Sequence, residues 1–540
     1  MKSGDSIRHA QRRFAGGCVV IFLMIASCLP LGSALEIGGD EGFELIKAFL
    51  CHQGYKLYED VWNDQPPAHT LLLAGLFSVT GPSLLAARLL AAGFGALLIW
   101  IFAHWIRGQT GSVAAAAGVG ILMAAPMFLT LAVSVMLEVP AFALGLLAGW
   151  LLEQRRRLLH PGWLVGSALT LAAALQVKLT AGILMPALLL QLLLCPGGTR
   201  SPDSLGRLGC DARSPGIPSR PGKFRPRRFA RLWTLRLLAV SIWLGTLVGT
   251  YALMACVMGS GGYDLLWASH HAPALQERLA SEQGYRFTLA QLADLPEGVA
   301  GAFVGIGLLV WRRDWHRLGF PLVWLVTALL VHLHHRPWWD YYMLHLAIPL
   351  AWLFALAMDA ASKLHGGFAR PSWLGRWLSP GALMVQVLLI SLGTVYGGER
   401  LALEFLAISS SERVTYNPLV QTLRHYAPRA HWMFTRNGIY AFHARVLPPP
   451  PLAVLPAKRF WSERLSESDL LSQVQGWQPD ILLVGEEEYK AGWESWLDNH
   501  YIRATQTKHL ALFVHKYIAD TSPMLSKRTD SYDLERRLGM

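Results

Sequence analysis

Long apolar runs dominate roughly the first 400 residues of the chain and are separated by short charged or turn-forming segments. An α-helix needs roughly 18–20 apolar residues to cross a bilayer. The runs that approach or exceed this length are 18–37, 84–106, 111–131, 237–258 and 380–397. Shorter apolar runs lie at 139–152, 163–176, 179–195, 298–311, 318–333 and 341–358. Together these runs predict a polytopic membrane protein with about eleven transmembrane helices.

The positions of Lys and Arg orient these helices, because cytoplasmic loops are enriched in both residues. Basic residues gather in the N-terminus (1–17), in Arg155–Arg157 and in the loop 196–236, which holds ten Lys and Arg against two acids. These three segments fall on one side only if the short apolar stretch 69–80 does not cross the membrane. We therefore expect cytoplasmic segments at 1–17 and 196–236. We expect a first external loop over 38–83 with juxtamembrane helices, one of them 69–80, lying in the interface.

The character of the chain changes at about residue 398, where charges become balanced and short apolar segments alternate with turns. Strands are expected at His431–Thr435, Leu452–Leu455, Asp480–Val484 and Leu510–His515. This pattern predicts a small external α/β domain over 398–540, following a transmembrane domain over 18–397. The expected fold class is thus an α-helical polytopic membrane protein with a small C-terminal α/β domain.

Composition agrees with a membrane protein. Of the 540 residues, 53% are hydrophobic and only 16% are charged, whereas soluble domains carry charge on about a quarter of their residues. The net charge of +12 could suit a nucleic-acid partner, but its excess lies in 196–236, without the aromatic stacking pattern of nucleic-acid-binding proteins. We expect a flexible cytoplasmic loop that follows the positive-inside rule and could contact anionic membrane lipid. The six cysteines show no spacing typical of a disulfide framework or a thiolate metal site.

An acidic pair, Asp40-Glu41, follows two glycines directly after the first apolar run. Ionisable groups at the edge of a membrane are costly and are therefore candidates for function. The alternative is structural: Asp40 would cap a helix that begins at Glu41, and Glu44 would complete the capping arrangement. The two interpretations are compatible with each other.

The same loop continues with Tyr58, Asp64 and Gln65. An acidic pair after the first span, then Gly-x-x-x-Tyr-x-Asp from Gly54 and a Gln-Pro-Pro, resembles the GT-C glycosyltransferases, in particular the protein O-mannosyltransferases and the lipid A aminoarabinose transferases. The resemblance covers roughly 18–360 and is weak in the C-terminal domain. It implies a sugar donor linked to a lipid phosphate, an acid of the pair as catalytic group, and substrate contacts from this loop.

The resemblance extends to two further positions. In such families a second acid lies at the outer end of the fourth span, and Glu138 occupies that place, although many relatives have Asp there. A basic residue that contacts the carrier phosphate matches Lys178, whose ammonium suits a phosphate leaving group. The alternatives are an acid at a helix N-terminus for Glu138 and snorkelling to the interface for Lys178.

The run from His332 to His345 combines histidines, aromatic residues and Arg336 at the predicted outer boundary. The family usually has a basic and aromatic stretch here, which implies Arg336 as a phosphate contact, because guanidinium groups bind phosphate oxygens bidentately. Substrate contacts are expected at His335, Trp338 and Tyr342. An aromatic belt at the membrane interface would account for some of the Trp and Tyr. The histidines could also form a zinc site, but no ligand spacing singles one out.

The expected reaction is transfer of a glycosyl group, with inversion, from polyprenyl phosphate to a lipid, glycan or protein acceptor on the external face of the cell inner membrane. Asp40 would act as general base or orient the nucleophile, and Glu41 and Glu138 would position the substrate. Asp40 and Glu138 could instead hold a divalent metal ion, and no other cofactor is expected. No nucleotide-binding Gly-rich loop is visible, which fits a lipid-linked donor.

Two other classes of function remain open at this point. A non-enzymatic transporter or flippase of the lipid carrier should have polar groups that extend through the membrane, whereas the candidate residues gather at one face. An interaction protein that recognises its partner through the external domain would leave the acidic first loop unexplained.

Overall fold

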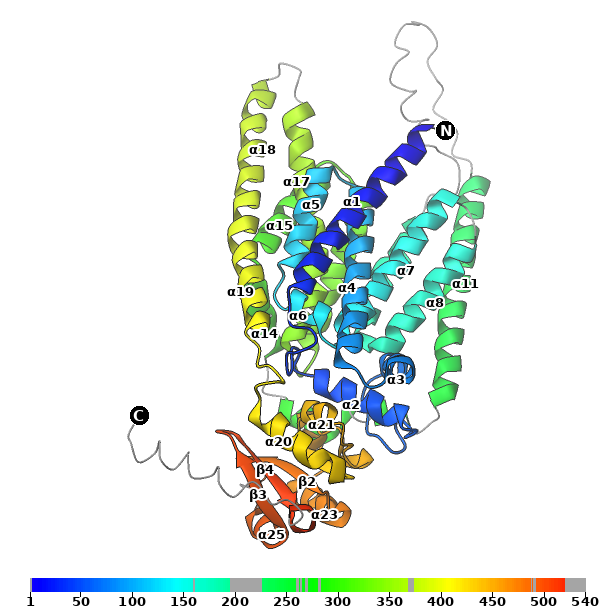
Figure 1. The fold of residues 1–540 in the computed structure, drawn as a ribbon. Helices are drawn as coiled ribbons and strands as arrows, with labels where there is room; N and C mark the ends of the chain where they lie inside the picture. The colour runs from blue at the N-terminus through cyan, green and yellow to red at the C-terminus, as the bar shows by residue number, and fades with distance from the viewer. Residues whose placement is uncertain are drawn as a thin grey trace, which may run out of the picture.

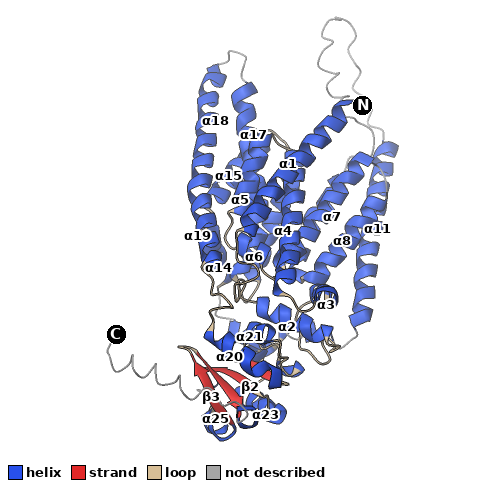
Figure 2. Ribbon diagram, in the orientation of Figure 1, coloured by secondary structure: helices blue, strands red, loops and turns tan. Residues whose placement is uncertain are grey.

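The computed structural model describes residues 2–158, 161–194, 226–258, 262, 265–267, 271–279, 283–367, 373–486, 488 and 492–519. The predicted basic loop over 196–236 therefore lies mostly outside the described residues. Helices form one elongated bundle with the N-terminus at one end, and a small sheet lies beyond the other end (Figures 1 and 2). We call the latter the domain end of the bundle.

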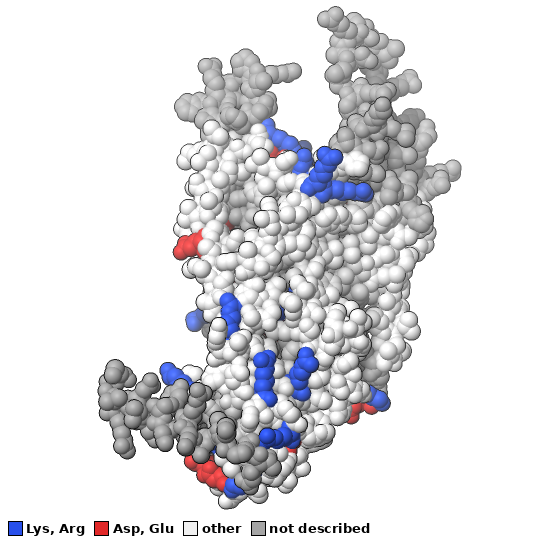
Figure 3. All heavy atoms as spheres, viewed as in Figure 1, with Lys and Arg blue, Asp and Glu red and all other residues white. Residues whose placement is uncertain are grey.

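The bundle contains α1 (Lys2–Ser27), α4 (Leu84–Arg107), α5 (Ser112–Met123), α6 (Phe128–Val133), α7 (Glu138–Leu158), α8 (Gly162–Val177), η1 (Leu179–Leu184), α9 (Met185–Leu194), α11 (Pro226–Met258), α14 (Gly284–Ala293), α15 (Pro296–Trp311), α16 (Trp315–His334), α17 (Met343–Gly367), α18 (Trp373–Leu392) and α19 (Gly398–Ser409). Each predicted apolar run contains helix, which confirms the helical membrane fold. Charged side chains are sparse on the face of the bundle shown in Figure 3, as a surface in contact with lipid requires.

The number of crossings differs from the prediction when it is judged by helix length. Within the described residues, six helical stretches are long and apolar enough to cross a membrane, or seven if the bent pair α14 and α15 forms one span. The helices α5, α8 and η1–α9 are apolar but shorter. Length and composition alone thus support fewer spans than the eleven predicted from the sequence.

The first predicted span, 18–37, is wrong in its extent. Helix α1 begins at Lys2 and ends at Ser27. Pro30 explains the early end, because proline cannot donate a helical hydrogen bond and disfavours the helical conformation of the residue before it. The chain then turns, with the Ala34 N–H donating to the Pro30 carbonyl at 2.9 Å.

The last predicted span, 380–397, ends too early. Helix α18 continues through the π-helix η4 (Gly393–Gly397) into α19, and the apolar stretch runs from Gly381 to Ser409. Two of the three charges of α19 have partners inside the bundle: Arg400 binds Glu297, and Glu404 accepts from the Thr130 N–H at 2.7 Å. The C-terminal domain accordingly begins after Ser409 rather than at 398.

Two helices occupy the first loop, α2 (Glu41–His52) and α3 (Ala68–Thr80). Helix α3 packs on α2 with His69, Leu73 and Phe77 buried. Its opposite side exposes Leu71 and Val79, the latter by 86%. A short helix with one buried face and one exposed apolar face fits the predicted helix in the membrane interface.

The C-terminal domain has a four-stranded sheet in the order β1-β2-β4-β3, in which only β1 and β2 are parallel. Its elements are α20 (Pro418–Tyr426), β1 (Met433–Thr435), α21 (Gly438–Ala444), η6 (Pro450–Leu452), α22 (Ala457–Trp461), α23 (Glu467–Trp477), β2 (Ile481–Gly485), α25 (Glu494–His500), β3 (Tyr501–Gln506), β4 (Leu510–His515) and α26 (Lys516–Ala519). The strand predicted at Leu452–Leu455 is wrong, because prolines on both sides of it lack the N–H that a sheet requires. The edge strand β3 was not predicted.

This domain docks tightly on the first loop. Helix α21 lies against α2, and a Cβ on Gly42 would come within 2.8 Å of the Ile439 backbone nitrogen. A Cβ on Gly438 would come equally close, 2.8 Å, to the Gly42 carbonyl oxygen. Phe442 of α21 packs on Phe49 of α2, and both belong to a hydrophobic core that the domain shares with the first loop. The two glycines therefore permit a contact that larger residues would prevent.

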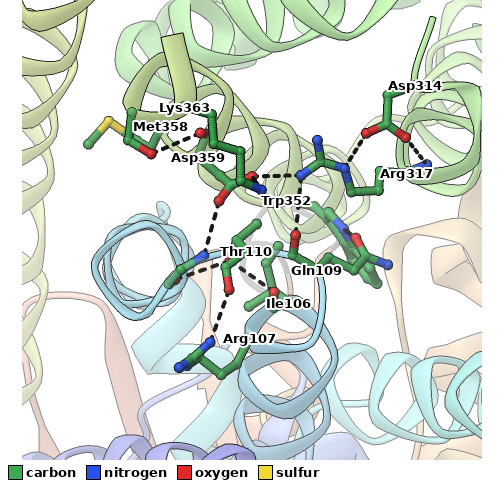
Figure 4. A network of polar contacts seen from close by, with 12 residues as sticks. Ile106, Arg107, Gln109, Thr110, Asp314, Arg317, Trp352, Met358, Asp359 and Lys363 are labelled. Carbon is green, nitrogen blue, oxygen red and sulfur yellow. Dashed lines mark hydrogen bonds and ion pairs between the residues drawn. The ribbon is translucent and has the colours of Figure 1, made fainter. Parts of the chain in front are cut away.

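At the other end of the bundle, a network of polar groups around the buried Asp359 ties three helices together (Figure 4). Asp359 of α17 accepts from Arg317 of α16 and from Lys363, each at 2.6 Å, and from the Gly111 N–H before α5 at 3.1 Å. Arg317 also binds Asp314 at 2.5 Å. Asp359 is paired with two cations, so its charge is balanced within the protein and no ligand is needed to account for it.

Membrane topology gives a prediction that does not depend on the function. In a cysteine-free background, single cysteines at Ser214, in the basic segment, and Ser466, at the N-cap of α23, should react with a membrane-impermeant thiol reagent from opposite sides. The physical reason is the cytoplasmic retention of basic loops. Labelling of both sites in intact cells would contradict an odd number of crossings between them.

Candidate active site

Two adjoining cavities lie at the domain end of the bundle, where the first loop, the bundle and the C-terminal domain meet. Their volumes are about 200 and 440 Å³, and together they match the roughly 300–1,000 Å³ of ligand pockets. The first, which we call the acidic compartment, is lined by Asp40, Glu44, Asp64 and Glu138, among others. The second, the basic compartment, is lined by Lys178, Arg336 and Lys458, with no carboxylate from the described residues. Residues that line both are Gln65, Lys178, Tyr341 and Lys458.

Asp40 lies at the wall of the acidic compartment, just before α2. It occupies the N-cap position, but its side chain makes no capping hydrogen bond, so the structural alternative for this residue is not realised. Burial raises the pKa of Asp40 to about 6, while Lys178 opposes the rise and Glu138 adds to it. A partly buried carboxylate with a pKa near neutrality suits a general base.

Glu41 has a different position from its neighbour. It is completely buried and is bound by Arg88 of α4, which donates from Nε at 2.9 Å and from Nη2 at 2.7 Å. The backbone N–H groups of Ile37 and Val135 also donate to Glu41, at 3.0 and 3.1 Å. Glu41 does not line either compartment. Its carboxylate connects α2, α4 and the segment before α7. This arrangement indicates a structural role for Glu41 rather than the predicted catalytic one.

Glu44 and Lys47, one turn apart on α2, form a buried pair that the sequence did not single out. The Lys47 ammonium donates to Glu44 at 2.6 Å and to Asn63 at 2.9 Å. Burial alone would raise the pKa of Glu44, but Lys47 and His69 outweigh it and hold the pKa at about 2. Glu44 is therefore an anion whose charge is already neutralised. The i,i+3 spacing of opposite charges was the available signal.

Glu138 and Lys178 meet across the acidic compartment. Glu138 is the first residue of α7, and Lys178 lies in the break between α8 and η1, where the backbone is extended. The Lys178 ammonium binds Glu138 Oε1 and lies 4.3 Å from the centre of the Tyr341 ring. Glu138 Oε2 is buried and has no hydrogen-bond partner among the described residues. The structure thus brings together Glu138 and Lys178, two of the residues that the resemblance singled out.

The basic compartment contains most of the residues predicted from the late loop. Arg336 lines it and donates to the Leu279 carbonyl at 2.9 Å. His335 and Tyr342 line it too, and the His335 Nε2 lies 3.1 Å from the Tyr342 hydroxyl. Arg336 and Lys178 therefore face one cavity, although they are distant in the sequence.

Trp338 does not line either compartment. Its indole is buried and donates to the His332 carbonyl at 2.9 Å, and its ring packs against those of His332 and Tyr342. The next residue, Trp339, lines the acidic compartment instead. The sequence identified the correct stretch but not which of two adjacent tryptophans faces the cavity, since no helical or strand periodicity holds in this segment.

The first loop contributes Asp64 and Gln65 directly. Asp64 lines the acidic compartment and pairs with Lys458 of the C-terminal domain at 3.1 Å. Tyr58 lines neither cavity; its hydroxyl donates to the Gln65 carbonyl at 2.7 Å and so supports the segment that does. Lys458 was not predicted, because no local signal shows that a residue so late in the chain returns to the first loop.

A metal site at Asp40 and Glu138 is not apparent from the arrangement of side chains. Within the part of the chain that the structure describes, no group of three or more His, Cys, Asp or Glu could hold a metal ion. Glu138 is already paired with Lys178. The two acids share one compartment, and their joint binding of a divalent cation stays a prediction.

Comparison of this structure with solved structures identifies the fold of the chain. ArnT from Cupriavidus metallidurans in the apo state superposes with a TM-score of 0.57 at 16% sequence identity, covering 92% of this chain and 98% of that protein. The same protein bound to undecaprenyl phosphate gives a TM-score of 0.55 at 15% identity, covering 93% and 97%. The chain has the GT-C glycosyltransferase fold. 

Sequence comparison agrees over part of the chain. Residues 64–204 match the family model of dolichyl-phosphate-mannose-protein mannosyltransferases. No curated protein matches the sequence significantly. The matched region includes Asp64, Glu138 and Lys178, while Asp40 precedes it.

Proposed function

We propose that this protein is a glycosyltransferase that moves a sugar from a polyprenyl-phosphate donor to an acceptor at the domain end of its membrane bundle. The observation that carries the proposal is the junction of two unlike cavities: one contains the Asp40 carboxylate, and the other is lined by cations without a carboxylate from the described residues. A lipid-linked sugar phosphate has a sugar that suits the acidic compartment and a phosphate that suits the basic compartment.

In the proposed reaction, an acceptor hydroxyl attacks the anomeric carbon of the donor sugar from the side opposite the phosphate. The bond between that carbon and the phosphate oxygen breaks, its electron pair leaves with the phosphate, and the anomeric configuration inverts. Asp40 takes the proton of the acceptor hydroxyl. Lys178 and Arg336 offset the charge that develops on the departing phosphate.

Other residues of the site would hold the sugar. Glu138 Oε2, which is buried without a partner among the described residues, can accept a hydrogen bond from a sugar hydroxyl. Asp64 and Gln65 offer further polar groups on the same wall. Tyr342 and His335 would contact the donor from the basic compartment. We propose that Glu41 supports the site structurally, because Arg88 occupies its carboxylate.

Two comparisons support a polyprenyl-phosphate donor. ArnT has been crystallised with undecaprenyl phosphate, and the matching family model is named for dolichyl-phosphate-mannose enzymes. We further propose that the protein lies in the cell inner membrane with the domain end on the external face, since the basic segments belong to the opposite side. The acceptor would be a lipid, a glycan or a protein.

A flippase for the lipid carrier would need polar groups along a path through the bundle. The candidate residues instead gather at the domain end, and the polar network at the other end is closed by the Asp359 ion pairs with Arg317 and Lys363 (Figure 4). This separation favours chemistry at one membrane face.

The pH dependence of transfer tests the proposal. Asp40 must be ionised to take a proton, and its pKa is raised to about 6. Transfer from a polyprenyl-phosphate sugar by the purified protein should therefore be constant above about pH 7 and fall as the pH drops through about 6. An ordinary aspartate, with a pKa of about 3.9, would keep the rate constant down to about pH 5. Absence of transfer from every polyprenyl-phosphate sugar tried, at any pH, would argue against the enzyme.

A further inference from the structure

The C-terminal domain supplies part of the wall of the candidate active site. Its segment 454–458 lines the acidic compartment, and Lys458, in the five-residue helix α22, lines both compartments. A residue that faces both cavities lies where the sugar and the phosphate of a donor would join.

Helix α22 is fixed in this position by three contacts, two with the first loop and one with the late loop. Lys458 pairs with Asp64 of the first loop, and both side chains are largely buried, with exposed fractions of 11% and 13%. The guanidinium of Arg459 lies 5.7 Å from the centre of the Trp62 ring. Trp461 stacks on Trp339 of the late loop, with the ring planes 4° apart and their centres 6.4 Å apart.

The segment before α22 is held as firmly. Arg459 donates to the carbonyls of Pro451 and Val454, at 2.8 and 3.0 Å. The close contact of Gly42 with α21 anchors the whole domain on α2. Lys458 is therefore held at the site in the same way as the residues of the membrane bundle, rather than carried on a separate, loosely attached domain.

The charges around Lys458 indicate what it binds. Asp64, its ion-pair partner, lines only the acidic compartment, whereas Lys458 also lines the basic compartment beside Lys178 and Arg336. All three cations line that compartment, and no carboxylate from the described residues does; Lys178 and Lys458 are each paired with an acid that lines the other compartment. Three cationic donors along one cavity match the several acceptor oxygens of a phosphate group better than they match a neutral sugar.

We infer that Lys458 binds the phosphate of the polyprenyl donor together with Lys178 and Arg336, so that the C-terminal domain is part of the donor site. This inference rests on the proposed function. The alternative is a purely structural role, in which Lys458 only holds the C-terminal domain on the first loop through Asp64.

Binding of a polyprenyl phosphate that carries no sugar distinguishes these roles. The affinity of the full chain in nanodiscs would be measured for this lipid and for the uncharged polyprenol. Lys458→Met should weaken binding of the phosphate on the order of 10–100-fold, the equivalent of one charge-assisted hydrogen bond, and should not change binding of the polyprenol. Lys458→Arg should restore most of the affinity. Lys508→Met, an exposed lysine of the same domain, is the matched control and should bind as the wild type does.

The variant Asp64→Asn tests the two roles of Lys458 in a second way. If Lys458 binds the phosphate, removal of its counter-charge should leave the affinity equal or higher. If the ion pair only docks the domain, Asp64→Asn and Lys458→Met should weaken binding alike, and that result would overturn the inference. Wild-type affinity in Lys458→Met would overturn it as well. A wild-type protein that does not prefer the phosphate to the polyprenol would overturn the proposed donor class itself.

Discussion

Replacing Asp40 with asparagine should lower the rate of sugar transfer by roughly 10²–10⁴-fold, the usual contribution of a general base. Asparagine has nearly the same shape but cannot accept the acceptor's proton at neutral pH. Because the Asp40 side chain makes no capping hydrogen bond, the substitution should leave α2 and the fold intact. The measurement is turnover with saturating polyprenyl-phosphate sugar, and the residual rate should no longer fall through a pH of about 6.

Glu59→Gln is the matched control, since Glu59 is an exposed acid of the same loop. It should transfer sugar at the wild-type rate. The assignment of Asp40 is wrong if Asp40→Asn retains wild-type turnover. It is also wrong if the loss of turnover is explained by loss of folded protein, which a lower midpoint of thermal unfolding would show.

The sequence predicted the membrane helices well because their signal is local. A run of apolar residues marks each helix of the bundle, even where the run is shorter than a bilayer crossing. The ends were less accurate where a single residue or a distant partner decides them. Pro30 ends α1 early, and Glu297 allows Arg400 to stay inside the extended last helix. Only the first of these two causes can be read locally.

The candidate site shows the same division. Asp40, Glu138, Lys178 and Arg336 were selected from a family pattern, and the structure places all four around the two joined cavities. The pattern could not show what each charge is paired with. Asp40 and Glu41 are adjacent in the sequence, yet one lines a cavity and the other is enclosed by Arg88. Such differences arise from packing between elements far apart in the chain.

Lys458 illustrates the limit most clearly. It is 394 positions from Asp64, its ion-pair partner, and the segment before it was predicted as a strand. Prolines keep that segment out of the sheet and leave it free to line the acidic compartment. The role of Lys458 depends on the docking of α21 on α2. The only trace of this docking in the sequence is a pair of glycines with no obvious function, Gly42 and Gly438.

Breaking the buried pair of Glu41 and Arg88 should cause a large loss of stability near the site. Both side chains are fully buried, so Arg88→Met would leave a carboxylate in an apolar environment without its partner. Breaking such a pair typically costs about 3–5 kcal/mol, and we expect a marked fall in the midpoint of thermal unfolding in detergent. The double variant Glu41→Gln with Arg88→Met should recover part of the loss, because it removes the unpaired charge as well. If Arg88→Met unfolded at the wild-type temperature but no longer transferred sugar, Glu41 would have a direct part in the chemistry and the structural role given to it here would be wrong.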